Sequence, residues 1–122
     1  MTASYDADGA LKKIDRDVEM AQARAKQAAD AQGAMAAVRG KARSKDGDVA
    51  AEVDSNGVLT DLKLTDEALE DQPEDLARSI REVVREAQSD AGKQTMLIAD
   101  NAFGEGSPVS ARMRSELEKR MH

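Results

Sequence analysis

The sequence predicts an α+β fold: a long N-terminal helix, a three-stranded antiparallel meander, a second long helix, and a short C-terminal segment that is helical or disordered. Three observations predict it. An alanine-rich stretch keeps a spacing of three and four residues, Asp-Gly and Asn-Gly turns separate alternating segments, and a proline opens a second stretch with helical spacing. The 122 residues suffice for one domain. We expect residues 1–104 to form it and residues 105–122 to be a tail.

The first predicted helix covers residues 7–37, which are almost free of helix breakers. Its small and apolar residues follow a heptad pattern that continues to Gln32 and Met35. A helix of about 30 residues spans roughly 45 Å, which exceeds the width of so small a domain. The heptad seam is therefore either the core face of one helix or a surface that packs against its copy in a homodimer. The candidates for the dimer interface are Leu11, Ile14, Val18, Ala21, Ala25 and Ala28.

A β-hairpin is predicted after this helix, because the period of the sequence changes to two from Val38. Asp46-Gly47 fits a two-residue type I′ turn, which requires positive φ at both positions. This turn fixes the pairing of the two strands. One face pairs Lys45 with Asp48, Lys41 with Glu52 and Arg39 with Asp54, and the other pairs Ser44 with Val49, Ala42 with Ala51 and Gly40 with Val53.

A third strand follows a second tight turn at Asn56-Gly57. A two-residue loop there continues the apolar face of the hairpin onto the next strand. It places Val53 opposite Thr60, Ala51 opposite Leu62, and Val49 opposite Leu64.

A second long helix is predicted from Pro73, after an acidic loop over residues 65–72. Its apolar stripe consists of Leu76, Ile80, Val83, Val84, Ala87 and Ala91, with a continuation to Thr95 and Ile98. Residues 101–107 are expected to be a linker. A final helix that opens at Ser107-Pro108 would carry Val109, Met113, Leu117 and Met121 on one face.

The composition excludes most catalytic chemistry. The chain has no cysteine, and its single histidine is His122, so thiol nucleophiles, Ser-His-Asp triads and zinc sites built from these residues have no basis. No glycine-rich phosphate loop is present. We therefore expect neither an enzyme nor a bound cofactor or metal.

The charge and the chain's beginning indicate a cytoplasmic protein. The net charge is −6, no stretch reaches the roughly 18 apolar residues of a membrane span, and residues 1–8 are polar and acidic where a signal peptide is basic and then apolar. An acidic total also argues against a general polyanion binder.

Basic residues nevertheless gather at residues 39–45 of the first strand and residues 12–16 of the first helix. Such clusters contact phosphates without reading bases. For the strand, the alternative is a face that neutralises itself, because the hairpin register places acids opposite three of its cations. For the helix, the alternative is an ordinary solvated surface. The candidates for DNA contact are Lys12, Lys13, Arg16, Arg39, Lys41, Arg43 and Lys45.

The order of elements resembles the YbaB/EbfC family of nucleoid-associated proteins. The likeness covers about residues 8–100 and is carried by three segments: Val38-Arg39-Gly40-Lys41-Ala42, Asp54-Ser55-Asn56-Gly57-Val58 leading into Leu62, and Pro73-Glu74-Asp75-Leu76-Ala77 before Ile80. This resemblance implies a bacterial, cytoplasmic, nucleoid-located homodimer. Its sheets would join, its helices would project like the arms of tweezers, and it would bind DNA with little or no sequence preference, without a catalytic site or cofactor.

Divergent actinobacterial relatives of that family look similar and are associated with type VII secretion loci. The alternative function is therefore a non-enzymatic protein-interaction adaptor or secretion-associated scaffold that keeps the dimer and does not bind DNA. Its partner would be captured through the long helix or the tail.

Overall fold

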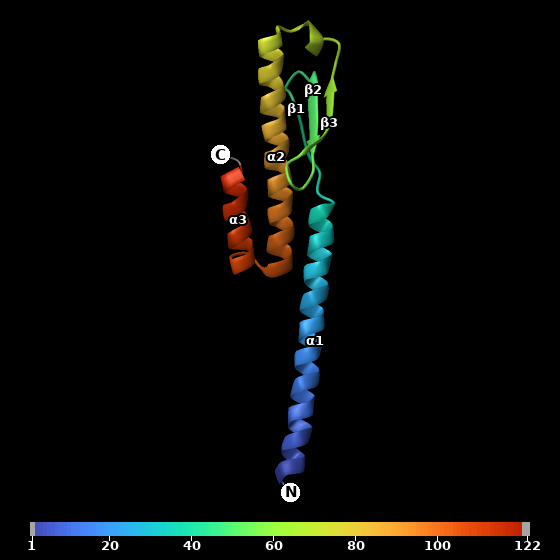
Figure 1. The fold of residues 1–122 in the computed structure, drawn as a ribbon, viewed down its shortest axis with the longest axis vertical. Helices are drawn as coiled ribbons and strands as arrows, with labels where there is room; N and C mark the ends of the chain where they lie inside the picture. The colour runs from blue at the N-terminus through green and yellow to red at the C-terminus, as the bar shows by residue number, and fades with distance from the viewer. Residues whose placement is uncertain (1, 121–122) are drawn as a thin grey trace.

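The computed structural model describes residues 2–120 and confirms the α+β fold class (Figure 1). A long helix leads into a three-stranded antiparallel sheet, and two further helices follow a single 3₁₀ turn. The elements are α1 (Thr2–Ala36), β1 (Gly40–Arg43), β2 (Val49–Val53), β3 (Leu59–Leu64), η1 (Ala68–Glu70), α2 (Pro73–Phe103) and α3 (Pro108–Arg120).

Helix α1 projects from the rest of the chain as an arm (Figure 1). Only its C-terminal end packs against α2, where Ala31 is buried and Met35 is half-buried. Further toward the N-terminus, Leu11, Ile14 and Val18 are 60%, 55% and 48% exposed. Over this part of α1 the heptad seam is therefore not a core face within its own chain.

The hairpin of β1 and β2 has the predicted register, with Gly40 opposite Val53, Lys41 opposite Glu52 and Ala42 opposite Ala51. The predicted type I′ turn is wrong, because Gly47 has φ 79° and no residue other than glycine has a positive φ among those the structure describes. The Ser44 amide donates to the Val49 carbonyl, and the Ser44 carbonyl accepts from the Gly47 amide. The loop therefore has four residues, 45–48. Both loops bring Ser44 opposite Val49, which is why the register is unchanged.

Asp46 organises this loop. Its carboxylate accepts hydrogen bonds from the Ser44 hydroxyl at 2.6 Å and from the Asp48 amide at 3.0 Å. The hydrogen bond from Ser44 and, to a smaller extent, the one from the Asp48 amide hold the pKa of Asp46 below its usual value. A lowered pKa in the folded state means that these bonds support the loop at neutral pH and are lost as the carboxylate protonates in acid.

The β2–β3 register matches the prediction at Val49–Leu64 and Ala51–Leu62, but the predicted Val53–Thr60 pair is wrong. Val53 pairs with Leu59, since the loop has three residues, 55–57, and is closed by the Asp54 amide bonding the Val58 carbonyl. One residue is left over as a bulge on β3. That residue is Thr60, whose hydroxyl donates to the Glu52 carboxylate at 2.7 Å.

The core lies between the sheet and α2. Val49, Ala51 and Val53 of β2 pack with Val83, Ala87 and Ala91 of α2, as the predicted stripe requires. Helix α2 packs mainly on β1 and β2, so the inner face of β3 is poorly covered and Leu59 and Leu64 are 42% and 37% exposed.

The C-terminal part differs from the prediction in its boundaries. Helix α2 continues to Phe103 and ends at Gly104, which has φ 90°, so the linker is shorter than residues 101–107. The Ser107 hydroxyl accepts from the Ser110 amide and caps α3, which folds back beside α2 (Figure 1). Met113 and Leu117 of the predicted face are half-buried, Val109 is 45% exposed, and Met121 lies outside the described residues.

Replacing Gly47 with valine is expected to destabilise the fold by about 1–2 kcal/mol, because a positive φ is costly for a β-branched residue. Thermal unfolding followed by circular dichroism measures this. Lys45→Val is the control, since it adds the same side chain to the same loop at a position without positive φ. Equal melting temperatures for the two variants would contradict the loop geometry.

Candidate nucleic-acid interface

The first strand is fixed against α2 by polar contacts as well as by packing. The Asp90 carboxylate accepts from the Lys41 amide and from the Gln94 side chain, both at 2.9 Å, and the same Gln94 amide donates to the Arg39 carbonyl at 2.9 Å. These contacts hold the backbone that carries the strand cations.

Arg39 lies at the junction of α1 and β1. Its guanidinium donates to the carbonyls of Ala36 at 3.2 Å and Val38 at 2.7 Å, where it satisfies carbonyls at the C-terminal end of the helix. The predicted pairing with Asp54 is therefore not formed, and the Asp54 carboxylate instead accepts amides of its own turn. Arg39 is exposed but already has a structural role.

The outer face of the sheet, which α2 does not cover, carries Lys41 and Arg43. Lys41 lies 3.9 Å from Glu52, as the register predicts. Arg43 has Ala50 opposite it and no ion pair among the described residues. Lys45 lies in the loop, and the Asp48 carboxylate predicted opposite it accepts the Thr65 hydroxyl at 2.9 Å. On this face Lys41 is therefore paired with an acid, whereas Arg43, two residues further along β1, is not paired with any acid that the structure describes.

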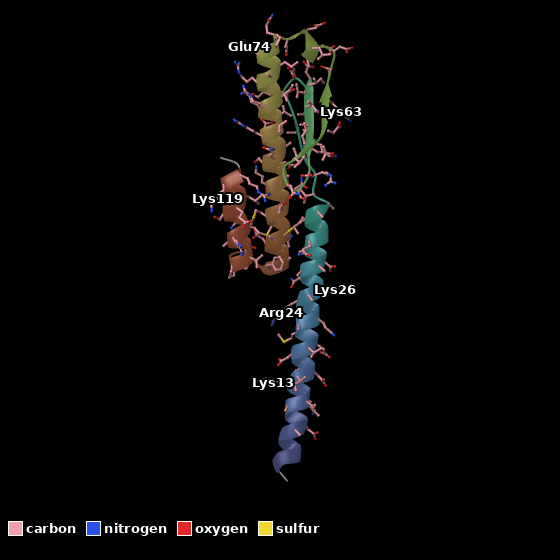
Figure 2. All side chains as sticks on the ribbon, in the orientation of Figure 1. Lys13, Arg24, Lys26, Lys63, Glu74 and Lys119 are labelled. Atoms are coloured by element: carbon pink, nitrogen blue, oxygen red, sulfur yellow. The ribbon has the colours of Figure 1, made fainter. Side chains whose placement is uncertain are left out.

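Lys63 of β3 lies in the same cross-strand row as Arg43, although it was not among the predicted contacts. Ala50 pairs with Arg43 on one side and with Lys63 on the other, so two cations flank a small side chain. Lys63, which Figure 2 shows on the sheet, is 79% exposed. Its ammonium lies 3.8 Å from Asp61. The predicted β2–β3 register already implied the Ala50–Lys63 pair, so the signal was present. A hollow of about 450 Å³ on this face is lined by residues that include Lys41, Arg43, Glu52 and Lys63.

The second predicted group lies far from the sheet. Lys12, Lys13 and Arg16 are exposed near the outer end of α1, and Figure 2 shows Lys13 on that arm, well separated from Lys63. Within the described part of the chain, none of the three has an acidic partner within 4.0 Å. A single chain therefore carries two separate groups of basic residues, and the group on α1 lies among Asp8, Asp15, Asp17 and Glu19.

The C-terminal helix holds two of its arginines, Arg112 and Arg114, in local contacts. Arg114 reaches Asp100 of α2 at 3.3 Å, and Arg112 lies 3.5 Å from Glu116 one turn away. The Arg114–Asp100 pair links α3 to α2, whereas the Arg112–Glu116 pair lies within α3.

Two further features bear on the site. Among residues 2–120, and only where their side chains are described, no group of three His, Cys, Asp or Glu is arranged to hold a metal ion. In that same range no helix is long and apolar enough to cross a membrane.

Comparison with known proteins gives one match. The model of the YbaB/EbfC DNA-binding family matches residues 11–105, which runs from the exposed part of α1 to the end of α2. No curated protein and no solved structure matches the chain significantly.

Proposed function

The chain belongs to the YbaB/EbfC DNA-binding family, a non-enzymatic family, and from this premise we propose that it is a nucleoid-associated protein that binds duplex DNA as a homodimer with little sequence preference. The family match is the observation that carries the proposal. It spans α1 from Leu11 onward, the sheet and α2, and so includes every candidate for DNA contact.

The charges support contact with phosphates on two surfaces. Lys12, Lys13 and Arg16 on α1, with Arg43 and Lys45 at the sheet, are exposed and lack acidic partners among the described side chains. Unpaired cations release condensed counterions from DNA without first breaking an ion pair. The largest acidic surplus lies elsewhere, because residues 65–92 hold nine acids and three bases. Asp8, Asp15, Asp17 and Glu19 nevertheless lie among the cations of α1.

The homodimer is supported by the uncovered edge of the sheet. Val58, Leu59, Leu64 and Leu69 are 59%, 42%, 37% and 63% exposed at and after β3. Exposed apolar side chains on and beside an edge strand are unfavourable unless another surface covers them. We propose that the β3 edges of two chains cover one another, which is the joining of sheets that the resemblance implies.

We expect sedimentation at low micromolar concentration to give twice the chain mass of 13.1 kDa. Replacing Leu59 and Leu64 with lysine should shift the protein toward the monomer, because it places cations in the apolar contact between the two edges. A wild-type protein that sediments as a clean monomer would contradict the dimer.

A gel shift across a salt series tests DNA binding. We expect duplexes of unrelated sequence to shift equally at about 50 mM salt and to be released as salt rises. No shift at about 50 mM would refute the proposal, since phosphate contacts are strongest there. A strong preference for one sequence would refute the absence of base reading.

A second candidate function, the protein-interaction adaptor or secretion-associated scaffold, is favoured by α3. This helix lies outside the residues that match the family, and a hollow of about 450 Å³ beside it is lined by Met96, Leu97 and Leu117. Deleting residues 105–122 should abolish binding of a protein partner and leave a DNA gel shift unchanged, so the two functions are separable.

A further inference from the structure

The seam of α1 is exposed from Leu11 to Ala25 and half-buried at Ala28, and it is asymmetric along its length. Its outer half carries the large residues Leu11, Ile14 and Val18, and its inner half carries Ala21, Ala25 and Ala28. We propose that this seam, over residues 11–28, pairs antiparallel with α1 of a second homodimer and so links dimers to one another. The inference rests on the proposed homodimer and is independent of DNA binding.

The side-chain volumes favour the antiparallel direction. In an antiparallel pair whose two-fold axis lies between Glu19 and Met20, Val18 faces the partner's Ala21, Ile14 faces the partner's Ala25, and Leu11 faces the partner's Ala28. Every layer then combines one large and one small side chain, so the two helices keep one separation along the seam. A parallel pair would place leucine on leucine at one end and alanine on alanine at the other, which no single separation fits.

The charges beside the seam select the same register. Asp17 and Arg24 lie one heptad apart on the same flank of α1, so the antiparallel pair described above brings Asp17 next to the partner's Arg24, twice. A shift of seven residues in one direction sets Asp17 against the partner's Asp17, and a shift in the other direction sets Arg24 against the partner's Arg24. These charges therefore specify the register by penalising its alternatives.

The partner on α1 cannot be the chain that joins the sheet. The end of α1 lies about 16 residues from the proposed axis, so the pairing keeps the two sheets about 50 Å apart. Each chain thus has two self-complementary surfaces, at the β3 edge and on α1, and together they connect dimers into a longer assembly. Since half of the seam is alanine, each layer buries little apolar area and the link should form only at higher concentration.

The pairing leaves the α1 cations accessible. Lys12, Lys13 and Arg16 occupy heptad positions on the side of the helix opposite the seam. The proposed link would therefore bring two cationic arms together without covering them, and a linked assembly could contact two duplexes.

Disulfide cross-linking tests direction and register, because the protein has no cysteine of its own. Ile14 and Ala25 lie about 16 Å apart along one helix, so in the antiparallel pair two copies of the same cysteine lie about that far apart and cannot bridge. We expect Ile14→Cys mixed with Ala25→Cys to form a covalent pair, and neither variant alone to do so. Lys13→Cys mixed with Lys26→Cys is the matched control, with a similar separation on the outer face, and should not cross-link.

Sedimentation tests the link between dimers. Wild-type protein should form species larger than two chains as its concentration rises, Arg24→Asp should stop at two chains, and Asp17→Arg with Arg24→Asp should restore the larger species. Cross-linking of Ile14→Cys alone as readily as of the mixture would refute the antiparallel direction. Absence of any cross-link, or a mass that never exceeds two chains, would refute the dimer link, while an unchanged gel shift would leave the proposed DNA binding intact.

Discussion

Replacing Gly40 with alanine is expected to destabilise the protein by about 3 kcal/mol and to lower its melting temperature by roughly 10–20 °C. Strand β1 crosses α2 at this glycine. A β-carbon there would lie 2.7 Å from both the Cβ and the backbone nitrogen of Ala91, and closer still to the carbonyl oxygen of Ala87. Because backbone atoms cannot rotate aside, the strand must move away from the helix. That movement would weaken the Asp90 and Gln94 contacts to β1.

Gly33→Ala is the matched control and is expected to have the opposite sign. Gly33 lies in α1 close to its contact with α2, and a β-carbon there would meet nothing within 4 Å. Alanine should stabilise the helix by about 0.5–1 kcal/mol. Thermal and urea unfolding of both variants measure the difference. A Gly40→Ala protein as stable as the wild type would mean that β1 and α2 do not approach as closely as described.

The sequence was a good guide where a pattern repeats. The register of both strand pairs near their centre follows from which residues are apolar and from the position of the turns, because a slip of one residue would turn every side chain to the opposite face. Turn types were less predictable. Asp46-Gly47 and Asn56-Gly57 both favour two-residue loops, yet Ser44 and Asp54 accept amides of their own loops, and longer turns form around them.

The sequence places the strand cations on one face of the sheet, but it does not show which of them are paired with acids. Alternation alone places Lys41 and Arg43 on one face. It does not show that Arg39 turns to the carbonyls at the end of α1, because that contact depends on the angle between a helix and a strand. Nor does it show that residues 12–16 lie far from the sheet, since this depends on how much of α1 packs against α2.

Neutralising the cations at the end of α1 is expected to produce the largest reduction of DNA affinity. Lys12→Gln, Lys13→Gln and Arg16→Gln combined should lower the slope of log affinity against log salt by about 0.9 for each phosphate that the variant no longer neutralises, and should weaken binding at about 50 mM salt roughly ten- to hundredfold. These three cations have no acidic partner to release among the described residues, whereas Lys41 already pairs with Glu52. Gel shifts at several salt concentrations measure both quantities.

The control for this variant must remove the same charge elsewhere. Arg78→Gln, Arg81→Gln and Arg85→Gln combined also change the charge by three, but on the exposed side of α2, among the acids of residues 65–92. If binding depends only on net charge, both triple variants will bind DNA equally weakly, because the long-range field of the protein changes by the same amount. A weakening confined to the α1 variant would instead mean that the arm contacts phosphates directly. If neither variant changed the salt slope while the wild type still bound DNA, the contacts would come from other cations, and Arg43, Lys45 and Lys63 at the sheet would be the next to replace.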